Sequence, residues 1–161
     1  MSNPKPTRPG EVSIALPSTF DAGLHFIGRI RTPFKTLEDC PKNSRETEAT
    51  ATVEVDPAYA AGLDGVELFS HLLLLYWLDE ARRDLIRQAP KHLDVERGVF
   101  ALRSPIRPNP IGISVVELLS IDGNALTVRN IDCRDGTPLI DIKPYFPSTD
   151  SVPAARVAPR E

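Results

Sequence analysis

The stretch ISVVELLSIDGNALTVRN, Ile113 to Asn130, predicts a β-hairpin and decides the fold class. The apolar run from Ile113 to Ile121 is typical of a strand, and Asp122-Gly123 is a strong hairpin signal that joins it to a second strand at Ala125 to Asn130. Further strands are predicted at His25 to Arg31, Ala49 to Val55, Leu72 to Leu78, Gly98 to Arg103 and Leu139 to Ile142. Several short, evenly spaced strands with few helices indicate a barrel or a sandwich, so we expect a mainly β, single-domain protein.

Two segments between these strands carry helical signals. Asp56-Pro57-Ala58 offers an N-cap followed by proline at the first helical position, and Gly62 is a stop signal, so a short helix or turn is expected there. Leu72 to Leu78 is apolar on both faces, as in a strand that is buried on both sides. A helix that continues through Glu80 to Arg87 also fits the periodicity, and we expect the strand first and then a helical turn.

Composition gives general limits on the size of the domain, on its partners and on its compartment. The 161 residues suit one domain, and 16 prolines favour turns and extended segments over long helices. A net charge of −3 gives no global attraction to phosphates, so an RNA partner must be met by a local basic patch. The two cysteines, Cys40 and Cys133, have no metal-like spacing and fit free thiols in a reducing compartment, which predicts a cytoplasmic protein.

The ends of the chain differ in character from its middle. Residues 1–22 are rich in proline and lack any regular period, so we expect a disordered N-terminal tail, a domain at residues 23–151 and a C-terminal tail at residues 152–161. No secretory signal is visible, and the longest apolar run, Leu72 to Leu78, is far too short to cross a bilayer. We therefore expect no membrane association.

The two most informative polar elements are RSPIRPNPIG, Arg103 to Gly112, and DGTPLIDIKPY, Asp135 to Tyr145. Three prolines in the first element fix φ near −65° and restrain Ser104, Arg107 and Asn109 before any ligand arrives. Such preorganisation lowers the ordering cost of binding. A rigid turn with solvated arginines is the alternative for the first element alone, and the second element favours a site.

Several common chemistries have no support in the sequence. No G-x-G-x-x-G string and no G-x-x-x-x-G-K-[ST] string occurs, which argues against a Rossmann-type cofactor site and against nucleotide hydrolysis. His25, His71 and His92 lack zinc-ligand spacing, so no metal is expected. Ser104, His71 and Asp79 form a formal triad without the nucleophile-elbow context.

The two polar elements, with IGRIRTPF at Ile27 to Phe34 and LFSHLLLLYWLD at Leu68 to Asp79, resemble the TsaA-like (TrmO, formerly YaeB) family over about residues 24 to 150. The resemblance implies a β-barrel methyltransferase that uses S-adenosylmethionine. It further implies N6-methylation of N6-threonylcarbamoyladenosine at position 37, with the tRNA anticodon loop as substrate, and a homodimer.

By motif position, the resemblance also implies site residues. The expected cofactor shell is Asn43, Asp79, Glu80, Arg103, Asp132, Cys133, Arg134 and Asp135. A base or an anion stabiliser must help the proton leave N6, and the candidate catalytic residues are His71, Asp141, Lys143 and Tyr145. The candidate substrate-binding residues are Arg107, Asn109 and Lys143.

For several of these residues, a purely structural role is the alternative to a functional one. Asp79 and Glu80 fit a solvated strand end, Asp135 fits an Asx-turn that closes DGTP, and His71 fits a structural histidine. Many bacterial members carry an extension after the DIKPY motif, and this chain ends soon after it, which leaves the methyl acceptor more open than the cofactor. The alternatives are a methyltransferase for another nucleobase or a small molecule, and a non-catalytic S-adenosylmethionine-binding sensor or adaptor.

Overall fold

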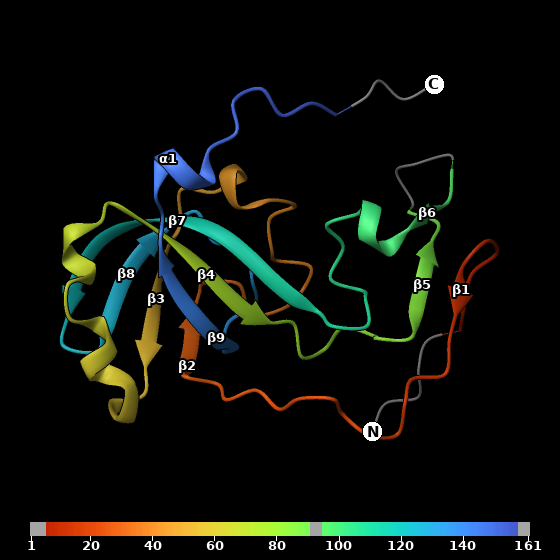
Figure 1. Cartoon of the computed structure of the whole chain (residues 1–161), viewed down its shortest axis with the longest axis horizontal. Coiled ribbons are helices and arrows are strands. Elements are labelled where there is room, and N and C mark those ends of the chain that lie inside the picture. The colour runs from red at the N-terminus through yellow and green to blue at the C-terminus, as the bar shows by residue number, and fades with distance from the viewer. Residues whose placement is uncertain (1–5, 91–94, 158–161) are drawn as a thin grey trace.

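Six antiparallel strands close into a barrel in the computed structural model, which describes residues 6–90 and 95–157 (Figure 1). Around the barrel the order is β2-β3-β8-β7-β4-β9, and β9 pairs again with β2. This confirms the prediction of a mainly β barrel. The strands are β2 (Gly28–Arg31), β3 (Thr50–Val55), β4 (His71–Trp77), β7 (Ile111–Asp122), β8 (Ala125–Arg129) and β9 (Thr137–Pro144).

The predicted hairpin is confirmed between β7 and β8. Asp122 pairs with Ala125, which leaves a two-residue loop of Gly123 and Asn124. Gly123 has a φ of +59°, in the left-handed region that so tight a turn requires. The turn therefore sets the register of the two strands next to it, and the register shifts between Leu118 and Ser120 farther along β7.

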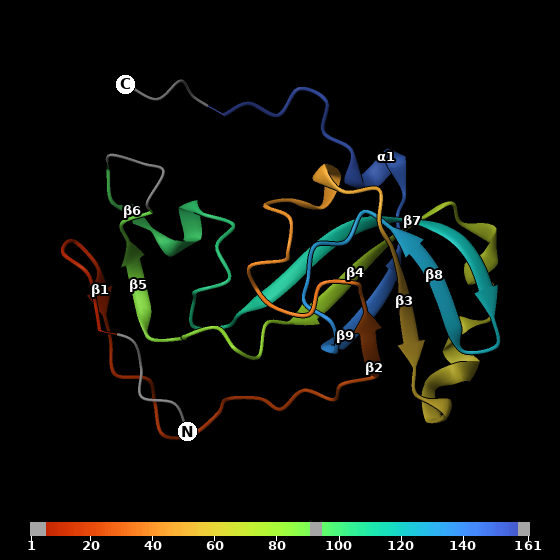
Figure 2. The ribbon, with the colours of Figure 1, turned by 180° about the vertical axis from the view of Figure 1, so that it is seen from behind.

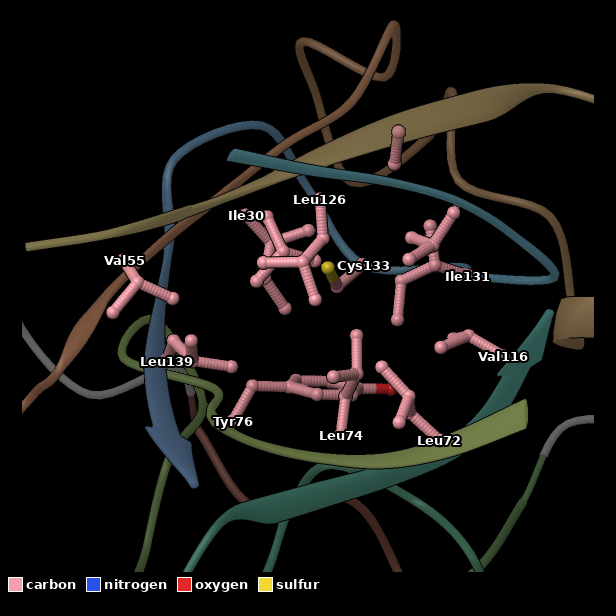
Figure 3. Close-up of a cluster of buried hydrophobic side chains, with 13 residues drawn as sticks. Ile30, Val55, Leu72, Leu74, Tyr76, Val116, Leu126, Ile131, Cys133 and Leu139 are labelled. Carbon is pink, nitrogen blue, oxygen red and sulfur yellow. The ribbon is translucent and has the colours of Figure 1, made fainter. Parts of the chain in front are cut away.

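Alternate residues of each strand fill the barrel. In β4, Leu72, Leu74 and Tyr76 are buried and the residues between them are half-buried. The expectation that this strand is buried on both faces is therefore wrong for its outer face. Figure 3 shows the inward side chains meeting in one core, whose fully buried members include Ile30, Leu72, Leu74, Val116, Leu126 and Leu139.

The helices are short, as expected. The predicted element after Asp56 is the 3-10 helix η2 (Pro57–Leu63), which ends one residue after Gly62. The remaining helices are η1 (Ser44–Glu46), η3 (Val66–Leu68), η4 (Val99–Ala101) and α1 (Pro147–Asp150).

A small sheet of β1 (Val12–Ser13), β5 (Leu85–Gln88) and β6 (Arg97–Gly98) stands beside the barrel, together with η4 (Figure 1). We call residues 82–90 and 95–107 the arm. The helical turn expected at Glu80 to Arg87 is wrong in its second half. A turn follows Leu78, whose carbonyl accepts the amide of Ala81 at 3.0 Å, but β5 then pairs with β1 and β6.

Two other expectations differ at this sheet. Val12 and Ser13 form a strand within residues 1–22, where no regular structure was expected, while the domain bounds stay a prediction. The strand predicted at Gly98 to Arg103 is wrong after its first residue, because η4 follows β6 directly. The carbonyls of this segment accept hydrogen bonds from a side chain instead of a neighbouring strand, as described below.

The antiparallel order gives the barrel two distinct ends. We call one end the cluster end: there β2 and β4 stop and β7 and β9 begin. We call the opposite end the groove end: there β2 and β4 begin and β7 and β9 stop. Chain segments far apart in sequence meet at each end. No helix within the described ranges has the length and apolar character needed to cross a membrane.

Candidate functional site

Polar side chains gather at the cluster end of the barrel, where three connecting loops meet. Figure 2 shows the loop after β2 beside the loop between β8 and β9, and the turn after β4 completes the group. We call this group the polar cluster; its members are Thr32, Lys35, Asp79, Glu80, Asp132, Arg134 and Asp135.

Asp135 ties the loop after β2 to the loop before β9. Its Oδ1 accepts the backbone amide of Thr32 at 3.1 Å, and its Oδ2 accepts Lys35 Nζ at 2.8 Å. The Asp135 amide in turn donates to the carbonyl of Phe34 at 2.7 Å. The hydrogen bond from Lys35 lowers the pKa of Asp135, so the carboxylate stays charged. The Asp135 side chain thus joins the two loops, and the DGTP turn is closed instead by the amide and the hydroxyl of Thr137, which donate to the carbonyl of Arg134 at 3.2 and 2.6 Å.

Arg134 links the same loop to the turn after β4. Its Nη2 lies 3.0 Å from Glu80 Oε1 and 3.9 Å from Asp79 Oδ1. All three side chains are partly exposed, so the ion pairs are worth little as stability and their charges are accessible to a ligand. The structure thus brings together the expected cofactor residues Asp79, Glu80, Asp132, Arg134 and Asp135.

Beneath the cluster lies a buried hydrogen-bonded chain that sequence reasoning missed. The hydroxyl of Tyr76 lies 2.9 Å from Ser114 Oγ and donates to Asp132 Oδ1 at 3.1 Å. Tyr76 is 4% exposed and Ser114 is 5% exposed, and burial raises the pKa of Tyr76 above its ordinary value. The phenol therefore stays protonated, and its hydrogen bond fixes one oxygen of Asp132.

Gly112 makes room for this arrangement. It pairs with Tyr76 across β4 and β7, and a Cβ on Gly112 would lie 2.2 Å from Cε2 of the Tyr76 ring. The signals available in the sequence were a tyrosine at an inward position of LLLLYW and a glycine at the start of the next long strand. That these two residues pair follows from the register between β4 and β7, which the sequence alone does not determine.

The two cysteines are free and lie at this end. Cys133 is buried next to Asp132 in the chain, and burial raises its pKa to about 12, so it acts as a core residue and not as a nucleophile. Burial also raises the pKa of Cys40, and the charge of Asp132 raises it further, which puts the loop of Cys40 near the cluster. Asn43 lies in that loop, where it caps η1 by accepting the amide of Arg45 at 3.0 Å.

The proline-rich loop is held by its own arginines. Arg107 donates from Nε to the carbonyl of Ser104 at 3.1 Å and from Nη2 to the carbonyls of Val99, at 3.0 Å, and Leu102. These contacts give it a structural role, and its substrate role stays a prediction. Arg103 donates to the carbonyl of Ile113, near the start of β7, at 3.1 Å and is otherwise exposed.

Asn109 precedes β7 at the same end. Its Oδ1 lies 3.4 Å from Nη2 of Arg83, whose Nε also donates to the carbonyl of Pro108 at 2.7 Å. The Arg83 guanidinium lies 5.2 Å from the centre of the Trp77 ring. These contacts fasten the arm to the barrel beside the polar cluster.

The candidate catalytic residues lie toward the groove end. His71 begins β4 and its carbonyl accepts the amide of Tyr145 at 3.1 Å, while Lys143 Nζ pairs with Asp141 Oδ2 at 2.8 Å. The Asp141 carboxylate raises the pKa of Lys143. Strand β4 rises about 3.3 Å per residue, so His71 and Trp77 are about 20 Å apart along it. Within one chain, His71 and Tyr145 therefore lie away from the polar cluster. Their catalytic roles stay predictions.

A groove of about 540 Å³ lies at the groove end, between η2 and β9. Its walls are mainly apolar, with Val55, Tyr59 and Phe69, and Asp141 and Asp64 at its edge. A ligand site is expected where a concave surface meets convergent polar groups, and here the two features are at opposite ends of the barrel. Charged and hydrogen-bonding groups of both signs converge at the polar cluster, whereas the lining of the groove is mainly apolar.

The donor set of the cluster defines what it can bind. Carboxylates accept from ammonium or hydroxyl groups, and arginine donates to a carboxylate. Within the described ranges no group of three His, Cys, Asp or Glu residues is placed to hold a metal ion, and His92 lies outside those ranges. The cluster is thus suited to a zwitterionic organic ligand.

Comparison with known proteins gives consistent matches. The family model of the tRNA-methyltransferase O N-terminal domain matches residues 29–151. The probable S-adenosyl-L-methionine-binding protein VirR of Rhizobium radiobacter is 47% identical over 137 residues, which cover 85% of this chain and 78% of that protein. The tRNA (adenine(37)-N6)-methyltransferase of Escherichia coli K12 is 36% identical over 140 residues, which cover 80% of this chain and 60% of that protein.

The fold is shared with a solved structure of this group. The crystal structure of TrmO from Pseudomonas aeruginosa superposes with a TM-score of 0.72 at 35% identity, covering 88% of this chain and 62% of that chain. The present chain thus spans about three fifths of the relatives named for tRNA methylation.

Proposed function

The chain belongs to the tRNA-methyltransferase O N-terminal domain family, and from that premise we propose that it binds S-adenosylmethionine at the polar cluster and methylates N6 of adenosine 37 in tRNA. The observation that carries the proposal is the convergence, at one barrel end, of five residues expected in the cofactor shell. Relatives named for S-adenosylmethionine binding and for methyl transfer support it.

The chemistry of the cluster fits this cofactor. Asp79, Glu80 and Asp132 supply acceptors for an ammonium group and for ribose hydroxyls, and Arg134 supplies a donor for a carboxylate. The bound cofactor supplies an electrophilic methyl group. The role of this chain is then to position the acceptor nitrogen and to exclude water, because in-line displacement depends chiefly on geometry.

The acceptor nitrogen must also lose a proton. We propose N6-threonylcarbamoyladenosine as the acceptor, because the carbamoyl group makes N6 more acidic than in plain adenosine. His71, Tyr145 and the Lys143–Asp141 pair are candidates to take the proton or to stabilise the anion. Since they lie toward the groove end, their participation requires a second copy of the chain, and we propose a homodimer in the cytoplasm, where tRNA and free thiols coexist.

A second candidate is binding of S-adenosylmethionine without transfer. Two relatives support it: VirR and the S-adenosyl-L-methionine-binding protein of Archaeoglobus fulgidus, 47% identical over 126 residues that cover 78% of this chain and 91% of that protein. Both are more similar to this chain than the E. coli methyltransferase.

Labelled methyl transfer separates the two functions. The protein is incubated with methyl-labelled S-adenosylmethionine and tRNA that does or does not carry the threonylcarbamoyl group at adenosine 37. The proposal predicts one methyl on N6 of the modified nucleoside and none on unmodified tRNA. Cofactor binding without label in either tRNA, or label only in a small molecule, would reject the tRNA assignment.

A further inference from the structure

We propose that the arm is the surface on which this protein docks the sugar-phosphate backbone and an unpaired base of its RNA substrate. The proposal rests on the proposed function, because it names the part of the chain that meets the RNA. It also answers a question raised by the composition, since a chain with a net charge of −3 needs a local basic surface to attract RNA.

Charge is strongly segregated between the arm and the rest of the chain. The described arm contains six arginines, no lysine and two carboxylates, Asp84 and Glu96, which gives a formal charge of +4. Lys91 and Asp94 cancel, so the remainder of the chain carries −7 to reach the total of −3. Arginine is the side chain whose planar fork matches phosphate, which makes this composition typical of a nucleic-acid surface.

Most of these positive charges are not neutralised within the described residues. The arm's ion pairs are Arg82–Asp84, with a distance of 2.7 Å, and Arg87–Glu96, with a distance of 3.5 Å. The guanidiniums of Arg83, Arg97, Arg103 and Arg107 instead donate to backbone carbonyls. A carbonyl fixes the orientation of a guanidinium and leaves its charge, so these four arginines keep their positive charge within the arm.

Phe100 supplies an exposed aromatic ring within the arm. It lies on η4, three residues from both Arg97 and Arg103 in the chain, and it is 85% exposed. Bases of single-stranded RNA stack on exposed aromatic side chains flanked by positive charge. An anticodon loop offers such unpaired bases, whereas a helical RNA stem does not.

The arm is also in the right place for the substrate of the polar cluster. Glu80 of the cluster precedes Arg82 of the arm by two residues, and Figure 1 shows the arm following directly from the end of β4. Arg83 holds the arm to the barrel through Trp77, at 5.2 Å from the ring centre. RNA that binds the arm therefore reaches the cofactor end of the barrel. A second copy of the chain, whose remainder is acidic, is the competing occupant.

The test measures how a fluorescently labelled tRNA transcript binds the full-length protein as a function of salt. Arg97→Gln removes one charge and should reduce the slope of log K against log[salt] by about 0.7 to 0.9. Phe100→Ala removes the stacking platform and should weaken binding about fivefold or more without changing the slope. Arg156→Gln, an exposed arginine outside the arm, is the matched control and should leave both quantities unchanged.

Two further readouts keep the outcomes distinct. Calorimetric titration with S-adenosylmethionine should give the same affinity for wild type, Arg97→Gln and Phe100→Ala, which shows that the variants are folded. Failure of the wild type to bind the cofactor would reject the proposed function and leave RNA binding by the arm measurable. The arm proposal is overturned if both variants bind tRNA like the wild type, or if light scattering shows that they change the oligomeric mass while RNA binding persists.

Discussion

Replacement of Tyr76 by phenylalanine removes one hydroxyl from the core and leaves the ring in place. That hydroxyl lies 2.9 Å from Ser114 Oγ and 3.1 Å from Asp132 Oδ1. A hydrogen bond to a charged group contributes about 1.5–3 kcal/mol and a neutral one about 1 kcal/mol. Because phenylalanine also avoids burying a hydroxyl, we expect the free energy of unfolding to fall by about 2–3 kcal/mol.

Urea unfolding measures this loss, with the fluorescence of Trp77, the single tryptophan, as the probe. A double-mutant cycle of Tyr76→Phe with Asp132→Asn isolates the pair and should give a coupling energy of about 1 kcal/mol or more. A Tyr76→Phe loss below about 0.5 kcal/mol, or additive effects of the two changes, would refute the hydrogen-bonded chain.

The pH dependence gives an independent check on the same residue. Burial raises the pKa of Tyr76 in the folded state, whereas tyrosine in the unfolded chain titrates near its usual value of about 10. The contribution of the hydroxyl is therefore fully present below about pH 10 and is lost as the pH rises above it. The difference in stability between wild type and Tyr76→Phe should shrink in that range.

Three other changes have expected outcomes of their own. Gly112→Ala should cost about 1–3 kcal/mol of stability in thermal unfolding, because its Cβ would lie 2.2 Å from the Tyr76 ring, and a neutral result would show that the ring has room to move. Arg107→Ala should increase hydrogen exchange of the loop amides, since three carbonyls lose their donor, and unchanged exchange would contradict the clamp. Asp135→Asn should lower the free energy of unfolding at neutral pH, because the Lys35 contact lowers the pKa of Asp135 in the folded state. The difference in stability between wild type and variant should be full above the unfolded pKa of about 4 and should be lost as the pH falls through the folded pKa. If the two proteins lose stability in parallel as the pH falls, the result would count against the Lys35 contact.

Local signals predicted the barrel strands well and the arm poorly. The Asp122-Gly123 turn, the alternating pattern of β3 and the apolar run of β4 depend on neighbouring residues, and the structure confirms those strands. The arm depends on long-range contacts: β5 finds its partner in Val12 and Ser13, and the segment after Gly98 turns away from strand geometry because Arg107 takes its carbonyls. Short-range periodicity does not contain that information.

The site shows the same division. Motif position grouped Asp79, Glu80 and the residues from Asp132 to Asp135, and barrel closure places most of them within contact of one another. Which inward-facing residue contacts these polar residues depends on the register between neighbouring strands. The pairing of Tyr76 with Gly112 therefore could not be predicted from the sequence. The distance between the candidate catalytic residues and the cluster follows from strand direction, which no motif specifies.

Calorimetric titration with S-adenosylmethionine on matched variants tests the central claim most directly, namely that the polar cluster is the cofactor site. The wild type should bind, and Asp132→Asn at the cluster end should weaken binding about tenfold or more, because a charge-assisted contact contributes about 1.5–3 kcal/mol. Asp64→Asn, which changes an exposed carboxylate at the edge of the groove, should bind like the wild type. Equal affinities for all three proteins, or a loss confined to Asp64→Asn, would contradict the account.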